Sequence, residues 1–238
     1  MYGELGRIGL MVPSVNTVVE PETAAMSPEG INVYATRLRN SKSDPEESER
    51  MLQHVERAAD ELASAGVDVI AFACTASSFI QGRKGEEDLK RRIEKSSGVP
   101  AVTTSGAVSS ALIRLGLKRI VLLTPYSEEL NELERRFLRE KGFDVLADRG
   151  MGIVDAFSIG KVEPGEVRKL AHEILKPEAD GLFISCTNLR ALEIIERLEK
   201  ETDKPVVTSN QATFWACLRR VGYSRSINGY GALLSHLT

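Results

Sequence analysis

Two apolar segments with nearly the same sequence constrain the fold of this chain more than any other feature. Residues 67–75 read VDVIAFACT and residues 179–187 read ADGLFISCT, so Cys186 follows Cys74 by 112 residues. A short apolar run without alternation is typical of a strand that is buried on both faces of a parallel sheet. In open α/β sheets, ligands bind at the carboxyl ends of the strands, which is where both cysteines lie. The pattern therefore predicts a parallel α/β fold with two functional thiols.

Other landmarks repeat with similar spacing. Pro125 follows Pro13 by the same 112 residues, and residues 204–208 repeat the pattern of residues 99–103 at a spacing of 105. Apolar strand patterns alternate with helical patterns along the whole chain, which is typical of βαβ units. We therefore expect an α/β protein of two similar lobes, each a parallel four-stranded sheet flanked by helices. Pseudo-twofold symmetry would place the active site between the lobes.

The repeat also suggests where the lobes begin and end. The first lobe is expected to span residues 1–115 and to be completed by the C-terminal segment 212–238. The second lobe is expected to span residues 116–211.

Several helices can be placed from local signals. Asp44 and Pro45 are a typical N-cap and first helical residue, and they predict one helix that runs to about Ala65. A further helix is predicted over residues 189–200. Residues 147–162 carry no clear periodicity and are interpreted as a loop with some extended backbone.

Composition excludes several classes of function. Charged residues make up 27% of the 238 residues and the net charge is -3, so no basic surface for nucleic acid or an acidic membrane is indicated. The first seven residues lack the features of a signal peptide, and no apolar run approaches the ~20 residues of a membrane-spanning helix. We expect a cytoplasmic protein with no nucleic-acid or membrane partner. A homo-oligomer is compatible with the sequence.

The cysteine count indicates reduced thiols. Three cysteines, Cys74, Cys186 and Cys217, form an odd set with no zinc-site spacing. No glycine-rich nucleotide fingerprint follows a strand. We therefore expect neither a metal nor a cofactor, so that the chemistry comes from side chains.

Cysteine is most often a small buried residue, and Cys217 in its apolar helical stretch is interpreted that way. Cys74 and Cys186 occupy equivalent positions of a repeat, which favours a catalytic role. Backbone N–H groups in the turn after each cysteine are expected to lower the thiol pKa and to bind a carboxylate. One thiolate would attack the substrate or abstract a proton while the other thiol donates one.

Residues near the two strand ends are candidates for binding the substrate. Asn16 follows the first strand and is as compatible with a turn as with a ligand contact. Tyr126 is the repeat equivalent of Ser14, so both are expected beside the cleft. The predicted substrate-binding residues are Ser14, Asn16, Thr75, Ala76, Tyr126, Thr187 and Asn188.

These segments together resemble the Asp/Glu racemase superfamily, and most closely its branch of maleate cis–trans isomerases and arylmalonate decarboxylases. The resemblance covers nearly the whole chain and rests on residues 13–17 with Glu20, on Cys74-Thr75, on residues 124–126, on Cys186-Thr187 and on residues 229–231. It implies a cofactor-independent enzyme for a small carboxylate or dicarboxylate.

By that resemblance, Cys74 adds to the alkene as nucleophile and Cys186 supplies and removes the proton. Asn16 and Tyr126 would hold a carboxylate. A maleate-type isomerase is the leading interpretation. A racemase or an arylmalonate-type decarboxylase that transfers protons through an enediolate is the alternative, followed by a binding protein without chemistry.

One segment departs from the maleate isomerases, which have a second ligand-binding asparagine in the region that corresponds to about 150–160. Here Asp155 and Ala156 occupy that region. Asp155 is expected to repel a carboxylate, whereas Val154, Ala156 and Phe157 would make room for a less polar substituent.

Overall fold

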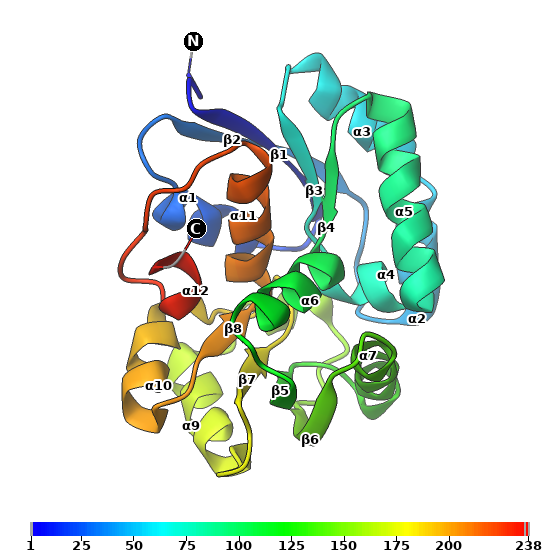
Figure 1. Cartoon of the computed structure of the whole chain (residues 1–238). Helices are drawn as coiled ribbons and strands as arrows, with labels where there is room; N and C mark the ends of the chain where they lie inside the picture. The colour runs from blue at the N-terminus through cyan, green and yellow to red at the C-terminus, as the bar shows by residue number, and fades with distance from the viewer. Residues whose placement is uncertain (1, 236, 238) are drawn as a thin grey trace.

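Two parallel four-stranded sheets form the framework of the computed structural model, which describes residues 2–235 and 237 (Figure 1). The first sheet has the order β2-β1-β3-β4 and the second has the order β6-β5-β7-β8. The strands are β1 Gly6–Pro13, β2 Ile31–Leu38, β3 Val69–Phe72, β4 Ala101–Thr103, β5 Arg119–Thr124, β6 Asp144–Gly150, β7 Gly181–Ile184 and β8 Val206–Thr208. The predicted fold class is confirmed.

Helices connect the strands and cover the sheets. They are α1 Val19–Met26, α2 Pro45–Leu52, α3 Val55–Ser64, α4 Thr75–Phe79, α5 Gly82–Ser97, α6 Thr104–Arg114, α7 Glu128–Glu140, α8 Ala156–Ile159, α9 Pro164–Ile174, α10 Ile195–Thr202, α11 Ser209–Arg220 and α12 Ala232–Ser235, with a 3₁₀ turn, η1, at Leu192–Ile194. None of the helices in this part of the chain is long and apolar enough to cross a bilayer.

The two sheets are built from equivalent interactions. The main-chain N–H of Arg7 donates to the Asp68 carboxylate at 2.8 Å, and Arg119 makes the same contact with Asp180 at 2.7 Å. Each arginine side chain also forms an ion pair with the same carboxylate. Both pairs sit at the starts of the central strands and are 112 residues apart, so the sequence repeat is a structural repeat.

The central strands are buried on both faces, as their apolar runs predict. Every residue of β3 and β7 is buried. Helices α3 and α5 pack on one another and contact strands of the first sheet, while α11, near the C-terminus, packs on α6 and contacts β3 (Figure 1). Division of the chain into domains at residues 115 and 211 stays a prediction.

The helix predicted from Pro45 to about Ala65 is wrong in one respect, because the chain forms α2 and α3 with a break at Gln53 and His54. The Arg92 guanidinium donates to the Leu52 carbonyl at 2.7 Å. In a continuous helix that carbonyl would accept the N–H four residues later. The hydrogen bond from Arg92 takes the place of that bond and favours the break.

The prediction of a helix over residues 189–200 is also partly wrong, since α10 begins only at Ile195 after the 3₁₀ turn. The Glu22 carboxylate accepts hydrogen bonds from the N–H groups of Ala191 and Leu192, each at 3.1 Å. Residues 147–162, interpreted as a loop, contain the end of β6 and the short helix α8.

Candidate active site

Cys74 lies just beyond the end of β3 and is the N-cap residue of α4. Its Sγ donates to the Ser77 hydroxyl at 3.3 Å. Burial raises the pKa of the Cys74 thiol, whereas the Ser77 hydroxyl and the N–H groups of Ser77 and Ala76 act to lower it. The expectation of a lowered thiol pKa is therefore wrong in sign, because desolvation of the thiolate outweighs these hydrogen bonds.

Cys186 occupies the equivalent position after β7 and adopts a left-handed backbone conformation, with φ of 91°. Such a conformation is uncommon for a residue with a side chain and is typical of functional sites. The Asn188 N–H donates to Sγ at 3.4 Å. Burial raises the pKa of Cys186 to about 12; the Asn188 N–H and the Tyr126 hydroxyl oppose this shift, and nearby Cys74 and Glu134 add to it.

Hydrogen bonds tie the two cysteine turns together. The Ser209 hydroxyl accepts from the Thr75 hydroxyl at 2.9 Å and from the Cys186 N–H at 3.0 Å. Thr187 donates through its hydroxyl to the Ala73 carbonyl at 3.1 Å. The ends of β3 and β7 are thereby held face to face, as the pseudo-twofold symmetry predicts.

Both thiols line one small cavity of about 30 Å³. Most predicted binding residues line it with them, namely Asn16, Thr75, Ala76, Tyr126, Thr187 and Asn188. A water molecule needs roughly 10–15 Å³ of such volume, so the cavity has room for only about two waters.

Asn16 and Asn188 use their side chains to join the lobes. The Asn16 amide donates to the Thr187 hydroxyl at 3.0 Å, while its carbonyl oxygen accepts from two N–H groups at the start of α1. Asn188 accepts from the Thr17 N–H at 2.9 Å and donates to the Ala156 carbonyl at 2.7 Å. Both side chains line the cavity and shape its walls.

Tyr126 is buried at the wall of the cavity, where its ring packs edge-on against Phe79 at 6.3 Å between centroids. Burial and the nearby Cys186 raise the pKa of the tyrosine well above its usual value. The phenol therefore keeps its proton and serves as a hydrogen-bond donor toward Cys186 or a ligand.

Ser14 is not among the residues that line the cavity. Its hydroxyl donates to the Asn40 carbonyl and accepts from the Asn40 N–H, each at 3.0 Å. Ser14 therefore anchors the loop after β2, and the repeat relation to Tyr126 does not bring the two side chains to the same wall.

The segment around Asp155 differs from what its sequence suggested. The Asp155 carboxylate accepts from the Ser158 N–H at 3.0 Å and caps α8, so it does not line the cavity. Val154 and Phe157 are 51% and 45% exposed and also lie outside the lining. Only Ala156 of this group reaches the cavity, where it adds an apolar wall.

The loop after β2 supplies residues that sequence reasoning did not identify. Lys42 and Asp155 form an antiparallel bridge, and the Ser43 N–H donates to the Val154 carbonyl at 3.1 Å. These contacts bring Lys42 to the cavity, where it is the one charged residue of the lining within the described ranges. Further lining residues that were missed are Pro13, Val15, Asn40, Ser43, Ser48, Ser77 and Ile159.

The remaining candidates lie elsewhere. Cys217 is buried in α11 and belongs to the hydrophobic core, where burial raises its pKa to about 12. In residues 2–235 and 237, no group of three or more His, Cys, Asp or Glu side chains is arranged to hold a metal ion.

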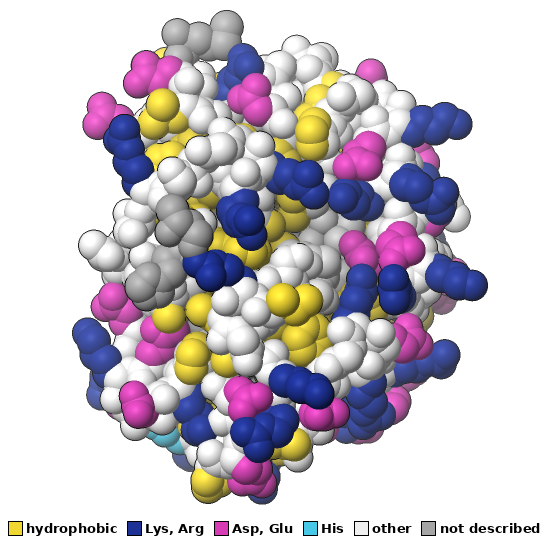
Figure 2. Space-filling model, viewed as in Figure 1, with side chains coloured by type: hydrophobic (Ala, Val, Ile, Leu, Met, Phe, Trp, Pro, Cys, Tyr) yellow, Lys and Arg dark blue, Asp and Glu magenta, His cyan; other side chains and the backbone are white. Residues whose placement is uncertain are grey.

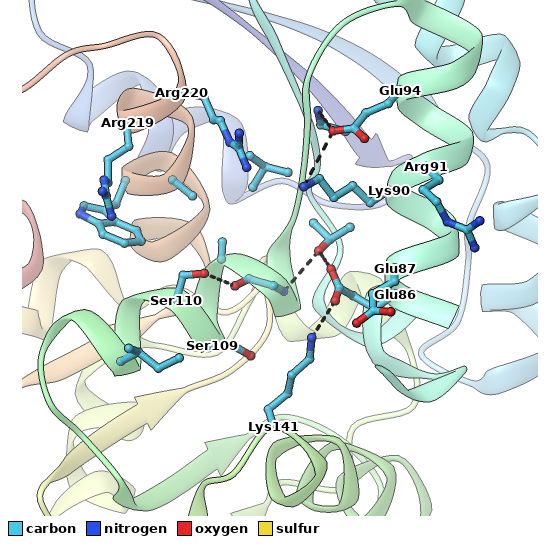
Figure 3. A pocket seen from close by; sticks show the side chains of 18 residues that line it. Glu86, Glu87, Lys90, Arg91, Glu94, Ser109, Ser110, Lys141, Arg219 and Arg220 are labelled. Atoms are coloured by element: carbon cyan, nitrogen blue, oxygen red, sulfur yellow. Dashed lines mark hydrogen bonds and ion pairs between the residues drawn. The ribbon is translucent and has the colours of Figure 1, made fainter. Parts of the chain in front are cut away.

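A larger cavity of about 850 Å³ lies between α5, α6 and α11 and contains none of the predicted site residues. Its apolar floor is framed by charged side chains of both signs (Figure 2). Figure 3 shows Arg219 and Arg220 on one wall and Glu86 on the other, where Glu86 forms an ion pair with Lys141 at 2.9 Å. No thiol lines this cavity, so the cysteine chemistry belongs to the smaller one.

Comparison with known proteins agrees with the two-lobed fold and the paired thiols. The family model for arylmalonate decarboxylase matches residues 8–234. The chain belongs to the arylmalonate decarboxylase family. It is 31% identical to a maleate isomerase of Pseudomonas putida over 98% of both chains, and 29% identical to the arylmalonate decarboxylase of Bordetella bronchiseptica over 95% of both.

A solved structure of this family is also close in shape. The maleate cis–trans isomerase of Nocardia farcinica, as a cysteine-to-serine mutant with a covalently bound succinylcysteine intermediate, is 27% identical and has a TM-score of 0.93. The match covers 97% of this chain and 98% of that one. These family members are enzymes that act on small substrates, and the protein is an enzyme of the same family.

Proposed function

We propose that the protein is a cofactor-independent cis–trans isomerase of a small dicarboxylate of the maleate type. The observation that carries this proposal is the placement of two thiols, from equivalent strand ends, on the walls of one cavity. The succinylcysteine in the Nocardia relative supports a covalent route through cysteine.

The reaction proceeds by reversible addition. The Cys74 thiolate forms a C–S bond to one alkene carbon, and the alkene electron pair moves to the other carbon, stabilised by the adjacent carboxylate. The Cys186 thiol protonates that carbon, giving a succinyl thioether and a thiolate on Cys186. Rotation about the new single bond follows. The rotation brings the other hydrogen of that carbon to Cys186. The Cys186 thiolate removes this hydrogen as a proton, the C–S bond breaks, and the trans alkene leaves with the Cys74 thiolate restored.

The surroundings of the two thiols support this division of roles. Burial raises the pKa of Cys74, and the Ser77 hydroxyl with two N–H groups act against this rise. Cys186 has in addition the nearby Cys74, whose negative charge, when that thiol is ionised, favours the protonated form of Cys186. Ionisation of Cys74 therefore favours the protonated form of Cys186, which is the form that donates the proton in the addition step. Lys42 and the N–H groups beyond each cysteine are the groups that would bind the substrate carboxylates.

Apolar lining favours a second candidate, an arylmalonate-type decarboxylase or a racemase. Val15, Ala156 and Ile159 present no hydrogen-bonding side chain to the cavity. A substrate with an apolar substituent would fit against them, with Cys186 as proton donor to an enediolate. The presence of Cys74 favours an isomerase or a racemase over a decarboxylase, because both of the former use a second thiol.

Incubation of the purified protein with maleate in deuterated buffer, followed by NMR, tests the proposal. Appearance of fumarate supports isomerisation. Unchanged maleate, together with carbon dioxide release or deuterium incorporation from aryl-substituted malonates or 2-substituted acids, supports the second candidate. Saturable binding of these acids without turnover would overturn both and indicate a binding protein.

A trapping experiment tests the covalent step separately. With Cys186→Ser and maleate, we expect a mass increase equal to that of maleic acid on the peptide that contains Cys74. Adduct formation on Cys217 or on no cysteine would contradict nucleophilic attack by Cys74.

We also propose that the enzyme acts in the cytoplasm without a nucleic-acid partner. The net charge of -3 and three free cysteines support this location, because unpaired thiols are typical of reducing compartments. Fractionation of cells that express the protein from its own sequence, with immunodetection, checks it.

A further inference from the structure

A carboxyl group is buried directly behind Cys186 and has no part in the reaction described above. Glu134 lies on the buried face of α7 between Leu130 and Phe137 and is only 1% exposed. Its Oε1 accepts a hydrogen bond from the Ser185 hydroxyl at 2.6 Å. Its Oε2 is buried without a hydrogen-bond partner. A carboxyl group in this setting is costly in its charged form.

Within the part of the chain that the structure describes, no cation forms an ion pair with Glu134. On its own helix, Arg135 is paired with Asp148 of β6 at 2.8 Å, and Lys141, just beyond the helix, is paired with Glu86 of α5. The titratable groups that face Glu134 are the Tyr126 phenol and the Cys186 thiol, and the Cys74 thiol lies beyond them. Burial accordingly raises the pKa of Glu134 to about 8, and the carboxyl is mostly protonated at neutral pH.

Glu134 is connected to Cys186 through the preceding residue. Ser185 is held twice, since its N–H donates to the Leu123 carbonyl at 2.8 Å and its hydroxyl donates to Glu134. Immediately afterwards the chain adopts the left-handed conformation of Cys186. A conformation of this kind persists only where neighbouring contacts hold it, and Glu134 supplies one of them.

We propose that Glu134 is a positioning residue for Cys186: its neutral carboxyl fixes Ser185 and keeps negative charge away from the thiol while that thiol gives up its proton. This inference rests on the proposed function of Cys186 as proton donor. If Glu134 ionises, a carboxylate lies beside the thiolate that proton donation would create. Proton delivery then becomes less favourable and turnover falls.

The test compares Glu134→Gln with wild type across pH, because glutamine keeps the shape and cannot ionise. We expect the ratio of kcat, variant over wild type, to be at least about fivefold larger at about pH 9 than at about pH 6.5. Glu129→Gln, an exposed charge-matched control on the same helix, should give a constant ratio. A constant ratio for Glu134→Gln as well would overturn the proposal, since a purely structural role does not depend on pH.

A second readout is independent of any substrate. The rate at which iodoacetamide alkylates Cys186, measured by peptide mass spectrometry at a series of pH values, reports the fraction of Cys186 that is ionised. We expect the Cys186 reaction in Glu134→Gln to begin at lower pH than in wild type, and superimposable profiles would overturn the proposal. If this shift is present but maleate is not isomerised, the electrostatic coupling holds and the proposed function fails.

The role of the hydrogen bond is tested by Ser185→Ala. This change leaves the carboxyl in place and removes the hydrogen bond that Ser185 donates to it, so turnover should fall at every pH examined. Infrared spectroscopy at neutral pH should show a protonated carboxyl band that is missing in Glu134→Gln. Absence of that band from folded wild-type protein would overturn the assignment of a neutral carboxyl.

Discussion

The hydroxyl of Thr187 donates to the carbonyl of Ala73 at 3.1 Å, so the residue after the second-lobe cysteine is bound to the residue before the first-lobe cysteine. The same hydroxyl accepts a hydrogen bond from the Asn16 amide at 3.0 Å. All three residues are buried. One side chain therefore joins both strand ends and a cavity wall, and the relative position of the thiols depends on it.

Replacement of Thr187 by valine should damage both stability and turnover. Valine has nearly the same shape but leaves the Ala73 carbonyl and the Asn16 N–H without a partner, at a cost of about 1–3 kcal/mol in the free energy of unfolding. We expect turnover to fall by at least about tenfold, because misplacement of reacting groups is costly. Urea unfolding and the isomerase assay measure the two effects.

Thr36→Val is the matched control, since the Thr36 hydroxyl bonds the partly exposed Glu61. It should change the unfolding free energy by no more than about 0.5 kcal/mol. Equal effects of the two substitutions would contradict the importance of the Thr187 link.

The three cysteines should differ sharply in their tolerance to serine. Cys74→Ser and Cys186→Ser each remove a thiol that lines the cavity, and we expect each to reduce kcat by at least about a thousandfold. Cys217→Ser lies in the core and should retain turnover, with a modest loss of stability. Circular dichroism verifies that the variants are folded. Full activity in either of the first two would exclude a mechanism that uses both thiols.

The repeat made much of this site accessible from sequence. Strands such as 69–72 and 181–184 are specified locally by their apolar runs, and parallel pairing then fixes where Cys74 and Cys186 lie. The helix start at Asp44 was equally local, and its carboxylate does accept from the Glu47 N–H at 2.8 Å.

What could not be predicted depends on contacts between distant segments. Lys42 reaches the cavity only because its loop pairs with residues 154–155 of the other lobe, and no local pattern encodes that pairing. Glu134 is different, because Leu130, Glu134 and Phe137 follow the i, i+4, i+7 spacing of a buried helix face. That spacing was a usable signal for a buried acid.

Replacement of Lys42 by methionine should weaken the binding of a dicarboxylate. Lys42 is the only charged residue among the described cavity-lining residues, and methionine retains its length without the charge. Loss of one charge-assisted contact is worth about 1.5 kcal/mol, which corresponds to a KM for maleate raised about tenfold with kcat little changed. Steady-state kinetics at low and high salt measure this, because an exposed charge is screened.

Lys176→Met, at an exposed site outside the cavity, serves as the control for a lost positive charge. An unchanged KM in Lys42→Met would show that the lysine does not contact the substrate. A large fall in kcat alone would instead indicate that the loop, rather than its charge, is required.

The buried carboxyl of Glu134 also predicts how stability varies with pH. Burial raises its pKa to about 8 in the folded protein, from a usual value of 4.5. The folded state therefore binds more protons than the unfolded state between these values, so the free energy of unfolding decreases as pH rises from about 4.5 to about 8. The full loss is on the order of 5 kcal/mol for this group.

Glu134→Gln lacks this titration and should gain stability relative to wild type over the same range. Urea unfolding at a series of pH values gives the free energy of unfolding of each protein. As pH rises over this range, we expect the variant to gain up to about 5 kcal/mol in stability relative to wild type. Glu129→Gln on the exposed face of α7 should show no such trend. Parallel stability curves for Glu134→Gln and wild type would mean that the carboxyl is ionised in the folded protein and stabilised by a contact other than Ser185.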